Sequence, residues 1–190
     1  MKPVHRNELL DLGAYEEIRE RFRARVIEEK KSRRVPLGDH MTVLFENRDT
    51  VLFQIQEMLR TERITQEKAV LHELETYNTL VPADGELSVT VFVEYADKEE
   101  RDRALEALAG VEERFYVSVN GTRASGRPEM RGDRTDRTTA VQYVKFPLGA
   151  ELAAAAKKDD ADLRLGVGHP EYSAETPLAG ALLASLKDEL

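Results

Sequence analysis

Residues 45–64, FENRDTVLFQIQEMLRTERI, set how the first half of the chain folds, because they predict a helix that follows directly on a strand. Asn47 and Asp49 both suit the N-cap position of a helix. From there Val51, Ile55 and Leu59 recur at the spacing of one helix face. We therefore expect a helix from Asn47 or Asp49 to about residue 63, with this face in the core.

The polar residues of the predicted helix do not form one solvated side. With about 100° of rotation per residue, Gln56 falls on the expected solvent side, and Phe53 and Ile64 form a second apolar ridge. Between this ridge and the core face lie four polar residues, Thr50, Gln54, Glu57 and Thr61. A polar row between apolar residues is typical of a buried or cavity-lining position, where each group needs a hydrogen-bond partner.

Two interpretations of this polar stripe stay open. In the first, its side chains are structural and hydrogen-bond to a loop backbone or to a neighbouring strand. In the second, Gln54 and Glu57 line a ligand or metal pocket. Further residues would then converge on that pocket, namely Glu46, Thr50, Arg60, Tyr77 and His169. A buried Glu57 would have a raised pKa and act as a general base.

The segments around this helix predict a helical N-terminal region. Ile18, Phe22 and Val26 form one apolar seam on a densely charged helix. The expected elements are that helix over residues 15–31, a β-hairpin of strands 34–37 and 41–46, and a helix over 66–80 that forms a helical hairpin with the helix of residues 47–63.

The rest of the chain is predicted to be mostly β. The expected strands lie at 86–96, 111–119, 138–146 and 161–168, with short helices at 97–110 and 149–158. Thr176 and Pro177 open a leucine-rich C-terminal helix. The fold class is therefore α+β, with N-terminal helices, including a helical hairpin, packed on a mostly antiparallel sheet of about four strands. We expect one domain, 1–190, with a helical region over residues 1–82, a sheet-rich region over residues 86–170 and the C-terminal helix over residues 176–190.

The composition excludes several classes of protein. The chain has 190 residues, no cysteine and a net charge of −8. Without cysteine it has no disulfides, thiolate metal ligands or cysteine nucleophiles. The negative charge disfavours nucleic acid as a partner, and no apolar run is long enough for a membrane span or a signal peptide. We therefore expect a soluble, cytoplasmic protein with no nucleic-acid or membrane partner.

Histidine and acidic residues give a weak metal-binding signal. His72 and Glu75 stand three residues apart on the helix over 66–80, opposite its apolar face. His169 lies in LGVGHPEY, residues 165–172, which is either a tight turn from a strand into the last helix or a functional loop. A metal site in this chain would draw on Glu57, His72, Glu75 and His169, and the sequence itself requires no cofactor.

A linker rich in arginine joins two of the predicted strands. Over residues 123–137 it carries Arg123, Arg127, Arg131, Arg134 and Arg137, together with three acidic residues. It is interpreted either as a self-neutralising loop or as an element that binds an anion or docks a partner.

Several blocks of sequence resemble one known family. They are residues 26–64, which contain the opening helix, ELETYNTLVP at 73–82, GTRA at 121–124, VQYVKF at 141–146 and VGHPEY at 167–172. The chain resembles an uncharacterised bacterial family of unknown function, number 3501. The resemblance implies no activity and no site residue. It does imply a context, because such proteins look like companions of rubrerythrin and of iron–sulfur oxidoreductases that are encoded beside them.

Two hypotheses about function follow. The first is an accessory protein of a cytosolic non-haem iron or iron–sulfur redox or oxidative-stress system, which docks to a partner such as rubrerythrin or an iron–sulfur oxidoreductase, or binds a ligand. The alternative is an enzyme, or a metal- or small-molecule-binding protein, with a polar pocket lined by Gln54 and Glu57. The leucine-rich C-terminal helix fits either closure of the core or a homodimer interface.

Overall fold

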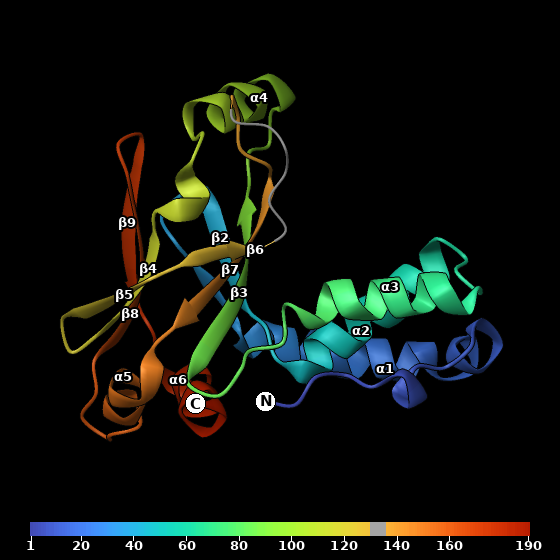
Figure 1. The fold of residues 1–190 in the computed structure, drawn as a ribbon. Helices are drawn as coiled ribbons and strands as arrows, with labels where there is room; N and C mark the ends of the chain where they lie inside the picture. The colour runs from blue at the N-terminus through green and yellow to red at the C-terminus, as the bar shows by residue number, and fades with distance from the viewer. Residues whose placement is uncertain (130–135) are drawn as a thin grey trace.

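Two antiparallel sheets face each other, and three helices lie against the outer face of the larger sheet (Figure 1). The structure is a computed structural model that describes residues 1–129 and 136–190. In spatial order, the larger sheet consists of β1 (Arg34–Pro36), β2 (Met41–Phe45), β3 (Glu86–Val93), β7 (Val141–Pro147) and β6 (Arg127–Glu129). The smaller sheet consists of β5 (Thr122–Ser125), β4 (Phe115–Val119), β8 (Leu163–His169) and β9 (Tyr172–Pro177). This arrangement confirms the predicted α+β class.

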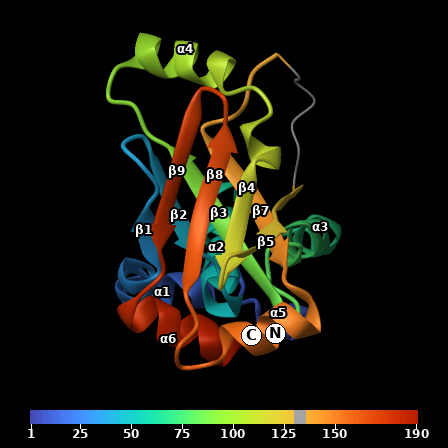
Figure 2. The same cartoon turned by 90° about the vertical axis from the view of Figure 1, so that its left-hand side faces the viewer.

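The helices divide into a layer beside the sheets and caps at their ends. The layer consists of α1 (Leu12–Ser32), α2 (Arg48–Thr61) and α3 (Glu67–Asn78). One end of the two sheets carries α4 (Lys98–Ala107), and the other carries α5 (Gly149–Ala156) and α6 (Gly180–Glu189) (Figure 2). Two short 3₁₀ turns, Arg6–Glu8 and Val111–Glu113, complete the described helical elements.

The space between the two sheets is filled by apolar side chains. Val89 and Val144 of the larger sheet and Val117 and Leu165 of the smaller one are all 0% exposed and belong to one cluster. Strand residues alternate between faces, so Ser88 and Thr90 of β3 point the other way, toward the helices. The alternation of valine with serine and threonine in β3 therefore separates an apolar interior from a more polar face.

A glycine forms the corner where the chain passes from one sheet to the other. Gly126 separates β5, which pairs with β4, from β6, which pairs with β7. A Cβ atom at Gly126 would lie 2.5 Å from Val144 Cγ1 and 3.1 Å from the carbonyl oxygen of Phe115. The first distance is shorter than real Cβ contacts and the second is tight, so this corner favours glycine.

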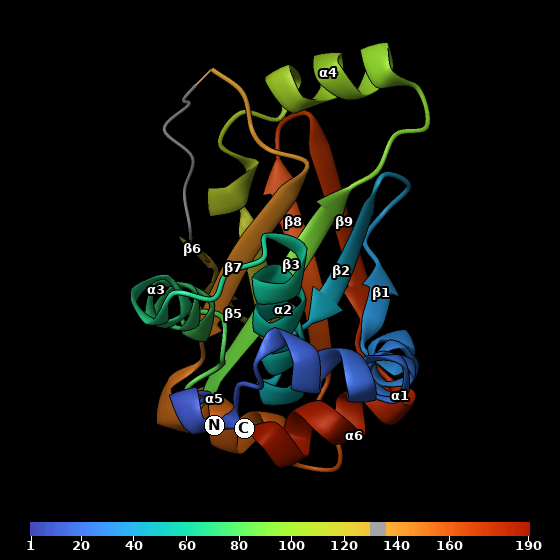
Figure 3. The ribbon, with the colours of Figure 1, turned by 90° about the vertical axis from the view of Figure 1, so that its right-hand side faces the viewer.

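The layer of helices, which Figure 3 shows on the near side of the larger sheet, has its own apolar cluster. Val51, Ile55 and Leu59, the predicted core face of α2, are buried there together with Val70 and Leu74 of α3. The helical hairpin of α2 and α3 is thus as expected. Asn47 is the N-cap of α2, and its side chain accepts a hydrogen bond from the backbone N–H of Thr50.

A buried arginine connects the helical layer to both the larger sheet and the last helix. Arg33, directly after α1, is only 2% exposed. Its guanidinium donates a hydrogen bond of 2.8 Å to the carbonyl of Phe45 and pairs at 2.5 Å with Glu189 of α6. A fully buried guanidinium needs such partners, because a buried unpaired charge is strongly destabilising.

The count of strands and the start of the last helix differ from expectation. Within residues 1–129 and 136–190 the two sheets hold five and four strands, because β5, β6 and β9 occupy stretches that were expected to be linker, turn or helix. LGVGHPEY is the hairpin between β8 and β9, not a turn into a helix. The last helix begins at Gly180 rather than at Thr176, because Pro177 ends an edge strand, where its missing N–H costs no ladder hydrogen bond.

In the portion of the chain that the structure describes, no helix is both long and apolar enough to cross a membrane.

Candidate functional site

The predicted polar stripe of α2 divides between two neighbours. Thr50 faces the larger sheet and hydrogen-bonds to the carboxylate of Glu46, which is 8% exposed. The hydroxyl of Thr90, on β3, donates to the same carboxylate at 2.6 Å. Both oxygens of Glu46 are therefore held by hydroxyl groups, in agreement with the structural interpretation of this end of the stripe.

Gln54 and Tyr77 lie together on the side of α2 that faces α3. Burial raises the pKa of Tyr77, and its hydrogen bond with Gln54 acts in the opposite direction. Tyr143 of β7 lies near Tyr77 and Glu46. Burial raises the pKa of Tyr143, and the charges of Tyr77 and Glu46 raise it further. Four of the predicted pocket residues, Glu46, Thr50, Gln54 and Tyr77, thus come together between the sheet and the helices.

Glu57 faces α1 instead. Its carboxylate accepts a hydrogen bond of 2.7 Å from the hydroxyl of Tyr15 and two of 2.8 Å from the guanidinium of Arg19. The Arg19 guanidinium lowers the pKa of Glu57, in spite of the opposing effect of burial. The expectation of a raised pKa was wrong, because the sequence does not show that an arginine of α1 faces this position.

The other predicted site residues are spread over the molecule. Arg60 pairs with Glu16 at 2.5 Å, and Thr61 is exposed. His169 lies on the smaller sheet, where its Nε2 is 3.2 Å from the carbonyl of Ala109 and its Nδ1 accepts from the N–H of Glu171 at 3.2 Å. These contacts hold the β8–β9 turn.

The candidate metal ligands are not brought together. His72 and Glu75 are exposed on α3, Glu57 faces α1, and His169 lies on the smaller sheet. Among the described residues there is no group of three His, Asp or Glu side chains that could hold a metal ion.

The arginine-rich segment is partly strand. The Arg123 guanidinium lies 3.9 Å from the centroid of the Tyr116 ring, Arg127 is exposed on β6, and Arg137 pairs with Asp102 at 3.2 Å. Arg131 and Arg134 lie outside the described residues. Arg123 and Arg137 thus contact Tyr116 and Asp102, which both lie outside the segment.

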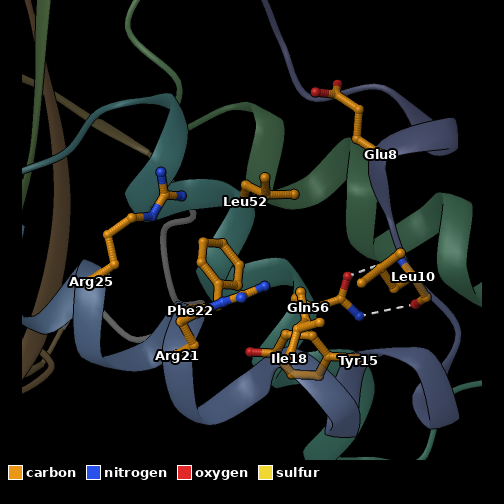
Figure 4. Close-up of a pocket in the computed structure, with 9 residues that line it drawn as sticks. All are labelled: Glu8, Leu10, Tyr15, Ile18, Arg21, Phe22, Arg25, Leu52 and Gln56. Atoms are coloured by element: carbon orange, nitrogen blue, oxygen red, sulfur yellow. Dashed lines mark hydrogen bonds between the residues drawn. The ribbon is translucent and has the colours of Figure 1, made fainter.

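A cleft of about 380 Å³ opens between α1, α2 and the segment that precedes α1 (Figure 4). Its walls are mainly apolar, from Leu10, Ile18, Phe22 and Leu52. Ile18 and Phe22 stand one helical turn apart on α1, and Leu52 faces them from α2. The seam predicted on α1 is thus only partly buried, because Val26 is 0% exposed whereas Ile18 and Phe22 keep some of their surface in the cleft.

The polar side of the cleft is fixed by Gln56. Its side-chain amide accepts from the N–H of Leu10 and donates to the carbonyl of Leu10, each at 3.0 Å. Gln56 is 2% exposed, so its expected solvent-facing position was wrong. The N-terminal segment covers this face of α2, which the helical pattern alone does not show.

Two arginines of α1 give the cleft a positive charge. Arg21 reaches into the space between Phe22 and Gln56, whereas Arg25 reaches toward the start of α2 (Figure 4). Arg25 pairs with Asp49 at 3.2 Å, and its guanidinium carbon lies 5.1 Å from the centroid of the Phe22 ring. Arg21 has no hydrogen-bond or ion-pair partner among the residues that the structure describes. The cleft therefore combines an apolar wall with a guanidinium that has free donors.

The comparison with known families agrees with the sequence resemblance. The profile of a family described as "Protein of unknown function (DUF3501)" matches residues 3–190. The chain belongs to this family. It is also similar to a crystal structure, at 1.90 Å resolution, of a novel protein of unknown function from Burkholderia pseudomallei K96243. The two share 34% sequence identity over 100% of both chains, with a TM-score of 0.91. A comparison with curated proteins finds no match.

Membership of this family identifies no site residue. The cleft was missed by the sequence analysis because three separate segments form it. Its one signal in the sequence was the apolar seam that contains Ile18 and Phe22. In the structure these two residues are only partly buried. The arginines beside that seam appeared as ordinary members of a highly charged helix.

Proposed function

We propose that this DUF3501 protein is a binding protein for a small organic oxyanion with an apolar body, and that it acts by binding rather than through chemistry of its own. The observation that carries the proposal is the guanidinium of Arg21, without a partner among the described residues, beside the apolar wall of Ile18, Phe22 and Leu52. A guanidinium binds carboxylate, sulfonate or phosphate oxygens through paired N–H donors.

The size and lining of the cleft support a small-molecule ligand. A volume of about 380 Å³ is within the range of small-ligand sites, which are mostly apolar with a few fixed polar groups. The hydrogen bonds between Gln56 and Leu10 hold one wall in place before any ligand binds. A preformed wall lowers the entropy that binding must offset.

The proposal is tested with a fluorescent anion of the right chemistry. Anilinonaphthalene sulfonate has an apolar body and one sulfonate, and phenylnaphthylamine is its neutral analogue. We expect the folded protein to bind the sulfonate more tightly than the neutral analogue. Arg21→Gln should weaken sulfonate binding roughly tenfold, while binding of the neutral analogue is unchanged.

The matched control is Arg23→Gln. Arg23 is an exposed arginine of the same helix that does not line the cleft, so its replacement should leave the affinity for both probes unchanged. Displacement of the sulfonate by octanoate or octyl phosphate, but not by octanol, would identify the oxyanion as the recognised group. Equal affinity for the charged and neutral probes would contradict the proposal.

The place of this binding in a redox system stays a prediction from the family resemblance. It supposes that the ligand-binding protein accompanies a rubrerythrin or an iron–sulfur oxidoreductase. Co-purification of the tagged protein with such a partner, under aerobic and anaerobic conditions, tests it. Failure to recover the partner in both conditions would leave the anion-binding proposal intact and remove the redox context.

A further inference from the structure

The two cleft arginines differ in their partners although they stand four residues apart on α1. Arg21 has no partner among the described residues, while Arg25 pairs with Asp49 at 3.2 Å. Residues four apart lie on the same side of a helix, and both arginine side chains line the cleft. The structure therefore has one cleft arginine ready for an anion and one that is already neutralised.

We propose that Asp49 is an internal competitor for the anionic group of the ligand. In the ligand-free protein its carboxylate holds the Arg25 guanidinium, and the oxyanion of the ligand takes its place when it binds. Asp49 thereby sets the affinity and the anion selectivity of the cleft. This inference rests on the proposed function, because it names the residue that regulates the same site.

The Arg25–Asp49 ion pair can separate at little cost in free energy. The side chains of Arg25 and Asp49 are 60% and 39% exposed, and an ion pair as exposed as this one contributes little to stability. Asp49 also lies in the first turn of α2, where the helix dipole stabilises a negative charge without any help from Arg25. Separating the pair therefore leaves neither charge buried and unsolvated.

The other carboxylate of the cleft is held elsewhere. Glu8 lines the cleft, but its oxygens accept hydrogen bonds from the Arg48 guanidinium and from the backbone N–H of His5. These contacts lower the pKa of Glu8, with the Arg48 hydrogen bond as the largest cause. Glu8 is thus ionised, and its carboxylate already has hydrogen-bond partners. Asp49 is the carboxylate that pairs with a cleft arginine, within the residues that the structure describes.

A double-mutant cycle tests the inference with the intact protein and anilinonaphthalene sulfonate as the probe. Asp49→Asn removes the competitor and should tighten sulfonate binding roughly two- to fivefold, the range that corresponds to an exposed ion pair. Arg25→Gln should weaken binding. In the Arg25→Gln background Asp49→Asn should have no further effect, because the competitor then has nothing to hold.

Glu28→Gln is the control for the general electric field. Glu28 is an exposed carboxylate on α1 that pairs with Lys31, so this change removes the same charge without contacting Arg25. It should change the sulfonate affinity less than Asp49→Asn does. The melting temperature of each variant, measured in parallel, shows that the affinities compare folded proteins.

The outcomes separate this inference from the proposed function. A gain from Asp49→Asn of the same size in both backgrounds, or no gain in the natural background, overturns the role of Asp49 while Arg21→Gln still weakens binding. Equal affinity of the natural protein for sulfonate and neutral probe overturns the proposed function, and the competitor with it.

Discussion

The two-sheet body and the helical layer bury their residues by different means. Between the sheets the buried side chains are mostly apolar, and Val89 and Leu165 are typical of them, although Gln142 of β7 is also buried on this face. In the helical layer, buried polar residues such as Glu46, Thr50 and Gln56 lie among the apolar ones, and each has a hydrogen-bond partner. The two-sheet body is therefore stabilised mainly by the packing of apolar side chains, whereas the helical layer also depends on specific hydrogen-bonded pairs.

This difference explains where a ligand can bind. The interior between the two sheets is closely packed with apolar side chains, as protein cores are. A layer held by local polar pairs can leave an opening, because pairs such as Gln56 with Leu10 fix the backbone without filling the volume beside it. The candidate cleft lies in the helical layer for this reason.

The join between the two regions should give the largest effect. Glu189→Gln leaves the guanidinium of Arg33, which is 2% exposed, without its counter-ion. We expect a loss of about 3 kcal/mol in the free energy of unfolding, measured by urea denaturation. Asp188→Asn, an exposed neighbour on α6, should change it by less than about 0.5 kcal/mol. Equal losses in the two variants would show that the buried ion pair does not join the regions.

A change inside the two-sheet body should have a somewhat smaller effect and depend on shape alone. Gly126→Ala places a Cβ atom 2.5 Å from Val144 and should destabilise the protein by about 2 kcal/mol through overpacking. Gly168→Ala is the matched control, because no atom lies within 4 Å of a Cβ atom there. Urea denaturation at low and high salt should give the same difference, and a salt-dependent loss would contradict a purely steric cause.

The sequence predicts the elements well wherever one pattern dominates. The 3.6-residue period of Val51, Ile55 and Leu59 and the alternation of β3 place both the α2–α3 hairpin and the central strand. It fails where short edge strands carry turn-forming residues. β9 contains Pro177 and little apolar sequence, and its pairing with β8 becomes visible only in three dimensions.

The candidate site, too, could be predicted from the sequence only where its contacts are local in the chain. The position of Glu46 and Thr50 in one buried polar group was within reach of the helical wheel, because both neighbours come from one stretch of chain. The helical wheel could not show that Gln56 is buried or that Glu57 has an arginine partner. Leu10 and Arg19 reach α2 from segments distant in sequence. A helical wheel shows which side of a helix is polar but not what covers it.

The smallest expected effect concerns the Glu57 pair and depends on pH. Because the Arg19 guanidinium lowers the pKa of Glu57 below its unfolded value, the unfolded chain binds more protons at acid pH. The stabilisation is therefore fully present above about pH 5, and it is lost as the pH falls through the folded-state pKa. Glu57→Gln should cost about 1 kcal/mol at neutral pH, with a smaller difference from the natural protein below about pH 4.

Thermal unfolding of both proteins between pH 3 and 7 measures this difference. Glu20→Gln, an exposed carboxylate on α1, should leave the unfolding free energy nearly unchanged across the range. A cost of Glu57→Gln that stays constant down to pH 3 would mean that packing around Tyr15, not the charge of Glu57, holds α1 against α2. The helical layer would then resemble the two-sheet body more closely than its polar pairs suggest.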